Sequence, residues 1–553
     1  GMLEADYFDE YREFYDPYYA MEQFGVVASL QRDLAGGILP EELFAVESWN
    51  VVDDMSEDGM TEGVLADTSA DGDQDNTTDT VSGNSVSDTT VSGNTVSGNE
   101  ASDNNTTDDI GAESDISDSD KAYAYNQLPI DFDKLSGLSD TKELQKLTEY
   151  IQSLEPTAQN EYTGMFEGYN LIYLTAEGFC PYAVDEQLTP TLYKMVNSGF
   201  VAKDYYVPLW QTSTSDGEYV NLTGLIPDQQ FSMKRSAVNE QPFSLASYFA
   251  REGVTSYAYH NNTLSYYDRH LSHPNLGYIF KATKLGEVTE EEWGDYIFPM
   301  ENANDWPASD LNMMKATIPE YINEERFHVY YMTVSGHMNY NFTGNQMSRK
   351  NKEAVADLPY SEEGRAYIAC NIELDKALEY LITELENKGK LEKTVICLSS
   401  DHYPYGMNVA NLEELAGKPL EGTLDIYRNS LILWNSEMET VEIDKACSAL
   451  DLMPTLLNLF GFPYDSRLFA GKDMLSDAPP MVVFADRSFI TDKISYYKKD
   501  KSVTQLTDEV VSEEYLSDMR SIVKNMNNFS SRVINNNYYH YVNQCLPENW
   551  YTQ

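Results

Sequence analysis

The chain has 553 residues and a formal net charge of -54 at pH 7, which argues against nucleic acid and anionic membrane surfaces as electrostatic partners. Its five cysteines are widely spaced and form no CxxC pair, so neither a disulfide framework nor a zinc knuckle is expected. No stretch reaches the roughly 18 consecutive apolar residues of a membrane span.

The first 120 residues fall into two zones of unusual composition. Residues 1–51 are rich in aromatic residues and have a helix-like pattern, and we expect this lead-in to follow a membrane region upstream of the sequence. Residues 52–120 contain many Asp and Glu, no Lys or Arg, and a near-repeat of the unit VSGN. Such low-complexity, single-sign composition predicts a disordered linker.

Residues 121–502 alternate short apolar runs with helical patterns, which predicts an α/β domain with a mainly parallel central sheet flanked by helices. The expected strands are 169–175, 255–260, 328–334, 393–399 and 429–435. The clearest expected helices are 366–389 and 451–461, from their apolar spacing. Residues 503–553 form a C-terminal helical extension dominated by one polar amphipathic helix, beside a smaller C-terminal α+β portion.

Polar side chains follow four of these strands. Glu177 comes after the first, His260 ends the second, His337 follows the third, and Asp401 and His402 follow the fourth. Parallel α/β sheets place their sites beyond the carboxyl ends of the strands, so we expect these residues to converge on one crevice. Taken singly, a Glu or His at the end of a strand is more often a cap or a loop hydrogen-bonder than a metal ligand. Together they are typical oxygen and nitrogen ligands of a divalent metal.

The predicted cluster of metal ligands changes the interpretation of the segment WQTSTSDGE, residues 210–218. Alone it reads as a polar loop, because Ser and Thr commonly cap helices and turns. A nearby cation would lower the pKa of a Thr hydroxyl and align its oxygen for attack. Thr214 therefore becomes a candidate metal ligand and catalytic nucleophile, acting on a phosphorus or sulfur ester.

Several motifs, in this order, resemble the extracellular catalytic domain of lipoteichoic acid synthases, the phosphoglycerol transferases of the sulfatase/alkaline-phosphatase superfamily. The matching segments are NLIYLTAEGF, TSTSDGEYVNLTGLIP, HNNTLSYYDRH, TVSGHMNY, LSSDHYPYG, ALDLMPTLLNLFG and FADRSFITDK. The resemblance runs from about residue 140 to 500. It departs from the family at Tyr267, where Trp is common, at Ser213, where Lys is frequent, and at Pro404, an extra residue.

The resemblance implies a sulfatase-like fold and a set of site residues. The implied ligands of one divalent metal, Mn²⁺ first and otherwise Mg²⁺ or Zn²⁺, are Glu177, Thr214, Asp401 and His402. The implied substrate-binding residues are His260, Tyr267, Arg269 and His337, with Arg269 suited to phosphate. Thr214 would attack phosphatidylglycerol and pass glycerophosphate to a glycolipid or polymer acceptor. The implied location is the outer face of the bacterial cytoplasmic membrane, through an N-terminal anchor.

Other functions stay open at this point. A phosphoethanolamine transferase with zinc, or a phosphodiesterase using water as the acceptor, would need similar residues. A sulfate-ester hydrolase is disfavoured, because that class needs a modifiable Cys or Ser within a C/S-x-P-x-R signature, and the segment around Thr214 has neither Cys nor a following Arg. A surface-interaction protein that merely retains the fold is the alternative without catalysis.

Overall fold

The computed structural model describes residues 123–228 and 231–552. The sequence predictions for residues 1–51 and 52–120 lie outside these residues. Within the described part, no helix is both long enough and apolar enough to cross a membrane.

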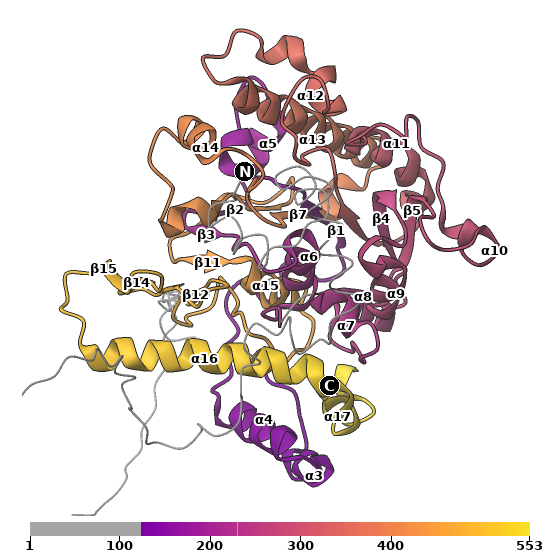
Figure 1. Ribbon diagram of the computed structural model, residues 1–553. Helices are drawn as coiled ribbons and strands as arrows, with labels where there is room; N and C mark the ends of the chain where they lie inside the picture. The colour runs from indigo at the N-terminus through magenta and orange to yellow at the C-terminus, as the bar shows by residue number, and fades with distance from the viewer. Residues whose placement is uncertain (1–122, 229–230, 553) are drawn as a thin grey trace, which may run out of the picture. The chain divides into compact units, whose positions relative to one another are not determined.

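A six-stranded sheet organises the fold, with the strand order β5-β4-β6-β1-β7-β9 (Figure 1). Its strands are β1 (Asn170–Ala176), β4 (Ser256–Thr263), β5 (Ile279–Lys284), β6 (His328–Met332), β7 (Thr394–Ser400) and β9 (Ile432–Trp434). Neighbouring strands are parallel except β7 and β9, which pair antiparallel. The predicted α/β class with a mainly parallel sheet is confirmed.

The central strand β1 is buried along its whole length, as expected for a strand covered on both faces. Leu171 and Tyr173 belong to one apolar cluster, and Ile172 and Leu174 belong to another. This alternation follows from the two-residue repeat of a strand. Figure 1 shows α11 and α13 on one side of the sheet and α8 and α15 on the other.

The helices that flank the sheet are mostly short, and α13 is the longest. Their bounds are α5 (Pro190–Val196), α6 (Ser213–Thr223), α7 (Ser232–Ser236), α8 (Leu245–Arg251), α9 (Arg269–Asn275), α10 (Glu290–Trp293), α11 (Asp310–Tyr321), α12 (Gln346–Lys350), α13 (Glu362–Asn387), α14 (Val409–Ala416) and α15 (Leu452–Leu459). The helix expected at 366–389 is α13, which begins four residues earlier, at Glu362. The preceding residue is Ser361, and its side chain accepts the Gly364 N–H. That hydrogen bond is an N-cap.

Three smaller sheets accompany the central one. They contain β2 (Phe200–Ala202) with β10 (Val441–Ile443), then β3 (Tyr205–Tyr206) with β8 (Arg428–Asn429) and β11 (Cys447–Ser448), and finally β12 (Val482–Val483), β13 (Phe489–Ile490), β14 (Ile494–Tyr497) and β15 (Ser502–Gln505). The last sheet is antiparallel throughout and precedes the C-terminal helices.

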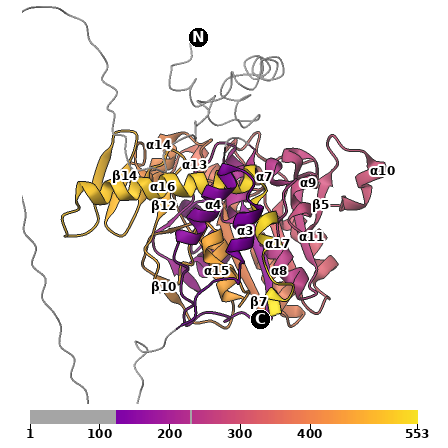
Figure 2. The same cartoon turned by 90° about the horizontal axis from the view of Figure 1, so that it is seen from below.

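The C-terminal segment differs from the single helix expected there. It forms α16 (Glu513–Asn535) and α17 (Tyr538–Gln544), because Asn537 takes a left-handed conformation with φ 48° that ends helical continuity. Figure 2 shows α16 beside α4 (Lys142–Ser153), and α17 contacts α3 (Phe132–Leu138), so the two ends of the described chain pack together.

Candidate metal centre and active site

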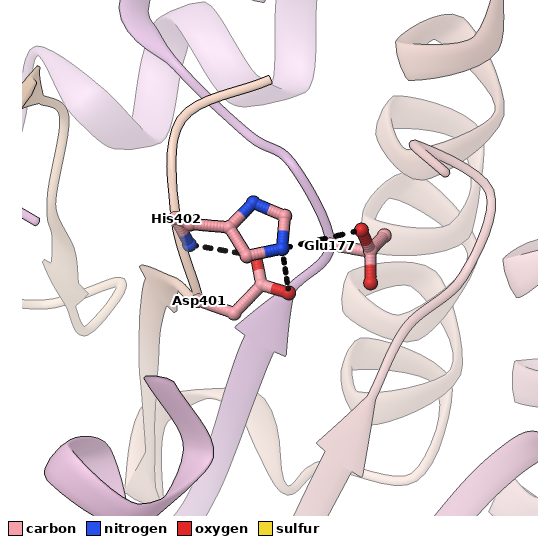
Figure 3. A group of neighbouring side chains, drawn as sticks. All are labelled: Glu177, Asp401 and His402. Carbon is pink, nitrogen blue, oxygen red and sulfur yellow. Dashed lines mark hydrogen bonds and ion pairs between the residues drawn. The ribbon is translucent and has the colours of Figure 1, made fainter. Parts of the chain in front are cut away.

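Three buried side chains meet just beyond the ends of β1 and β7 (Figure 3). Glu177 follows β1, and Asp401 and His402 follow β7. One ligand atom from each lies within 4.8 Å of the other two. His402 Nε2 lies 3.2 Å from Asp401 Oδ2 and 3.6 Å from Glu177 Oε1. Because β1 and β7 are parallel neighbours, their carboxyl ends deliver these residues to the same edge of the sheet.

The donor set of this cluster fits a metal cation. His402 Nδ1 lies 2.9 Å from the Tyr403 carbonyl and donates its N–H there, which leaves Nε2 with a lone pair. Oδ2 of Asp401 is buried and has no hydrogen-bond partner among the described residues. Lone pairs on Nε2 and on two carboxylates repel one another unless a positive charge lies among them. A divalent ion bound by nitrogen and oxygen satisfies all three.

Thr214 completes this group of oxygen and nitrogen atoms. Its Oγ1 lies 3.3 Å from Glu177 Oε2 and 3.2 Å from His402 Nε2. Thr214 is the second residue of α6, directly after Ser213, whose φ of 31° is unusual for a residue with a side chain. The buried carboxylate of Asp216 accepts the Thr212 N–H at 2.8 Å and so fixes the start of the helix.

Two glycines allow these segments to approach so closely. A Cβ added to Gly217 on α6 would lie 2.3 Å from the Asp401 carbonyl oxygen. A Cβ added to Gly336 would lie 2.2 Å from the Glu177 carbonyl oxygen. Neither contact is sterically allowed, so both positions need glycine for the backbones to reach the metal cluster.

The predicted substrate-binding residues line a hollow next to the cluster, of about 330 Å³ including open solvent at its mouth. The residues lining it are Glu177, Thr214, His260, Asn262, Tyr266, Tyr267, Arg269, Trp306, Met332, Val334 and His337. The structure thus brings all the predicted site residues to one place, since Asp401 and His402 lie beside the hollow in a cluster with Glu177, which also lines it. Their roles in binding and catalysis remain predictions.

Arg269 is held by residues that the sequence interpretation did not single out. Its Nε and Nη2 each lie 2.7 Å from Oε2 of Glu218, and both groups are buried. Burial alone would raise the pKa of Glu218, but Arg269 and His273 outweigh it and lower that pKa to about 2. The sequence could have pointed to Glu218 as a site residue, since it lies in the WQTSTSDGE segment, one helical turn after Thr214.

Trp306 and Asp310 were also missed, because no recognisable motif marks the connection that holds Trp306 or the start of α11, where Asp310 lies. The Trp306 ring meets the His337 ring edge-on, with 4.8 Å between centroids. Oδ1 of Asp310 accepts N–H groups of Val334 and of the Asn261 side chain, each at 2.9 Å. Asp310 therefore ties the loop after β6, which carries His337, to the end of β4.

His260 is neutral at physiological pH. Burial, reinforced by the neighbouring Arg269 charge, lowers the pKa of His260 to about 3. Its Nδ1 lies 3.0 Å from the Met332 carbonyl and donates there, so Nε2 accepts from Nη1 of Arg269 at 3.4 Å. His260 thus presents a neutral imidazole beside the arginine.

Comparison with known proteins places this site in a family. The sulfatase family model matches residues 170–462, which is more than half of the chain. The chain belongs to the sulfatase family. The match begins at β1 and ends after α15, and it includes Glu177, Thr214, Asp401 and His402.

The similar curated proteins include lipoteichoic acid synthases. Lipoteichoic acid synthase 2 of Bacillus subtilis (strain 168) is 23% identical over 72% of this chain and 61% of its own length. The lipoteichoic acid synthase of Staphylococcus aureus (strain USA300) is 25% identical over 66% of this chain and 57% of its own length. The match therefore spans only about three fifths of these relatives, and their activity transfers to this chain only as a proposal.

The fold is that of solved sulfatase-like proteins. The lipoteichoic acid synthase LtaP from Listeria monocytogenes superimposes with a TM-score of 0.57 at 19% identity, covering 71% of this chain and 98% of that one. A protein of the alkaline phosphatase superfamily from Vibrio parahaemolyticus gives 0.51 at 15% identity, covering 74% and 99%. The predicted sulfatase/alkaline-phosphatase-like fold is confirmed.

Gly217→Ala tests the close approach of α6 to the metal cluster. The new methyl group would push the helix away from Asp401, so we expect affinity for Mn²⁺ to fall at least about tenfold, since ligand atoms must hold their positions closely. Isothermal titration calorimetry on the folded variant measures this. Gly137→Ala is the matched control, because a Cβ there meets nothing within 4 Å. Unchanged Mn²⁺ affinity in Gly217→Ala would contradict the account.

The lowered pKa of His260 predicts a pH effect on stability. Below about pH 6.5 the unfolded chain protonates this histidine, whereas the folded protein does so only near 3. The free energy of unfolding should therefore fall as pH drops through this window, with a His260 contribution of about 2 kcal/mol at pH 5. Urea unfolding at about pH 7 and pH 5 measures this. Between these two pH values, the free energy of unfolding should fall less for His260→Gln than for the parent protein. An equal fall in the free energy of unfolding for both proteins would contradict the lowered pKa of His260.

Proposed function

We propose that this protein is a metal-dependent phosphoglycerol transferase. It moves glycerophosphate from phosphatidylglycerol to a glycolipid or polymer acceptor, by way of a covalent intermediate on Thr214. We further propose that it acts at the outer face of the bacterial cytoplasmic membrane, as lipoteichoic acid synthesis would require.

One observation carries the proposal. The hydroxyl of Thr214 lies within 3.3 Å of both Glu177 and His402, at the edge of a hollow that also contains Arg269. A hydroxyl beside a candidate metal cluster and an arginine is the arrangement expected for attack on a phosphoryl group. Similarity to lipoteichoic acid synthases supports glycerophosphate as the transferred group.

Glu177, Thr214, Asp401 and His402 would hold one divalent ion, Mn²⁺ in this proposal. When bound, the ion lowers the pKa of the Thr214 hydroxyl and offsets negative charge on the phosphoryl oxygens. The fixed orientation of His402, through its hydrogen bond to the Tyr403 carbonyl, presents Nε2 rather than Nδ1 to this ion.

In the first step, the Thr214 hydroxyl gives up its proton to solvent, Oγ1 attacks phosphorus, and the bond to the diacylglycerol oxygen breaks. Arg269 holds the phosphoryl oxygens through the N–H groups not used by Glu218. His337 lines the hollow with its Nδ1 3.3 Å from the Met338 carbonyl, so in its protonated form Nε2 gives a proton to the leaving oxygen. In the second step an acceptor hydroxyl returns a proton to His337 as its oxygen attacks the same phosphorus. The bond to Thr214 Oγ1 then breaks, and Oγ1 regains a proton from solvent.

Tyr267 and Trp306 provide aromatic surface in the hollow. The guanidinium carbon of Arg269 lies 5.3 Å from the centre of the Tyr267 ring, so this ring also helps to hold the arginine. We propose that the glycerol headgroup binds between the phosphate site and these aromatic side chains. A phosphoethanolamine headgroup, or water as acceptor, would use the same residues and is tested as an outcome below.

Turnover of labelled phosphatidylglycerol tests the function. With Mn²⁺ present, the protein should release diacylglycerol, and chelation should abolish release. Thr214→Ala should lower the rate by at least about 10³-fold, as expected when a nucleophile is removed. Ser215→Ala is the matched control, because this neighbouring hydroxyl is also buried on α6 but has no hydrogen-bond partner among the described residues.

The outcomes separate the alternatives. Release from phosphatidylethanolamine but not from phosphatidylglycerol would favour phosphoethanolamine transfer. Free glycerophosphate without any labelled acceptor product would favour a hydrolase. Equal activity of the Thr214→Ala variant would overturn the proposed role of Thr214.

A further inference from the structure

Glu218 joins the helix that carries the nucleophile to the arginine of the hollow. It lies on α6, four residues after Thr214, and its side chain is fully buried. Its Oε2 accepts from two nitrogens of Arg269, and its Oε1 lies 3.0 Å from the Tyr330 hydroxyl and 3.2 Å from His273 Nε2. Glu218 itself does not line the hollow, so it acts on a ligand there only through Arg269.

This pairing determines which edge of Arg269 a ligand can use. The Nε and Nη2 edge is occupied by Glu218, and one Nη1 hydrogen points toward His260 Nε2. A guanidinium has five N–H donors, so one hydrogen on each of Nη1 and Nη2 is not used by these contacts. These two hydrogens form the end-on edge of the guanidinium, which can bind two oxygens of one phosphoryl group.

The pairing also offsets the charge of Arg269. Arg269 is the sole Lys or Arg among the described residues that line the hollow, and His260 beside it is neutral. Glu218 is ionised at neutral pH because its pKa is about 2, and it lies in direct contact with the guanidinium. The two carboxylates of Glu177 and Asp401 would likewise balance a divalent ion. The centre as a whole therefore offers little net positive charge to an anion.

We infer that Glu218 is a positioning residue that makes this site select singly charged phosphodiesters over doubly charged phosphomonoesters. This inference rests on the proposed function, in that the hollow binds a phosphorus ester. A monoester carries close to two negative charges at pH 7, whereas a diester carries one. Each added negative charge is opposed by the buried Glu218 carboxylate, which lies on the far side of the arginine.

The selection suits a transferase that cleaves diesters. Its donor lipid is a phosphodiester, and so is the product that it makes. Free glycerophosphate and other soluble monoesters are the dianions that would compete for the same arginine. An arginine whose charge is partly offset binds them less well, while its end-on edge still orients the diester.

Binding of two small probes tests the inference on the 553-residue chain carrying Thr214→Ala, which prevents turnover. The probes are sn-glycerol 1-phosphate and its methyl diester, titrated by calorimetry with Mn²⁺ present. At about pH 8 we expect the diester to bind about tenfold more tightly. At about pH 5.5 the monoester gains a proton, so the ratio of the two affinities measured at that pH should approach one. Tighter monoester binding at about pH 8 would overturn the inference.

Adding Glu218→Gln then isolates the carboxylate. The amide keeps the shape but removes the negative charge, so the preference for the diester at about pH 8 should shrink about tenfold. Tyr330→Phe is the matched control, because it removes a hydrogen bond to the same carboxylate and leaves the charge, and it should keep the preference. An equal loss of affinity for both probes in Glu218→Gln would mean a purely structural role and overturn the inference.

Failure of this inference is distinguishable from failure of the proposed function. The probes report only the charge preference of the site and require no lipid, acceptor or chemical step. If Glu218→Gln does not fold, the pH dependence of the affinities for the two probes in the Thr214→Ala protein still tests whether the site prefers the diester. Turnover of phosphatidylglycerol with no diester preference would reject the role of Glu218 alone.

Discussion

The structure depends on one electrostatic constraint, the convergence of electron-rich atoms from Glu177, Thr214, Asp401 and His402. His402 donates from Nδ1 to the Tyr403 carbonyl, so its Nε2 is the nitrogen that lies beside the Thr214 hydroxyl and the two carboxylates. A cation among these buried atoms would offset the repulsion between the carboxylates. The donor set therefore fits a divalent metal ion.

The fold meets this constraint with two parallel strands and one short helix. β1 and β7 end side by side and deliver the carboxylates and the imidazole. Helix α6 supplies Thr214 at its first turn, Gly217 where it touches the Asp401 backbone, and Glu218 where it holds Arg269. One helix thus fixes three things: the position of the proposed nucleophile, its distance from the proposed metal ligands, and the position of the arginine proposed to bind phosphate. A change in any of the three would disturb the others.

Much of this arrangement could be predicted from the sequence. Glu177, Asp401 and His402 each follow a predicted apolar strand, and the carboxyl ends of parallel strands lie at the same edge of a sheet, so their convergence was expected from these positions. The motif order also indicated the fold, which the comparisons confirm. What could not be predicted depends on contacts distant in sequence. Glu218 looks like any helix carboxylate until Arg269 is brought to it, and Trp306 belongs to a connection without periodicity. The antiparallel β9 and the break at Asn537 likewise reflect tertiary packing and one backbone angle.

The most direct test of the central claim is intact-protein mass spectrometry of the enzyme quenched during turnover of phosphatidylglycerol with Mn²⁺, followed by peptide mapping. The account predicts a mass increase of one glycerophosphoryl group on the peptide that contains Thr214, absent when Mn²⁺ is chelated and absent in Thr214→Ala. Turnover without any such adduct, or an adduct on another residue, would contradict the account.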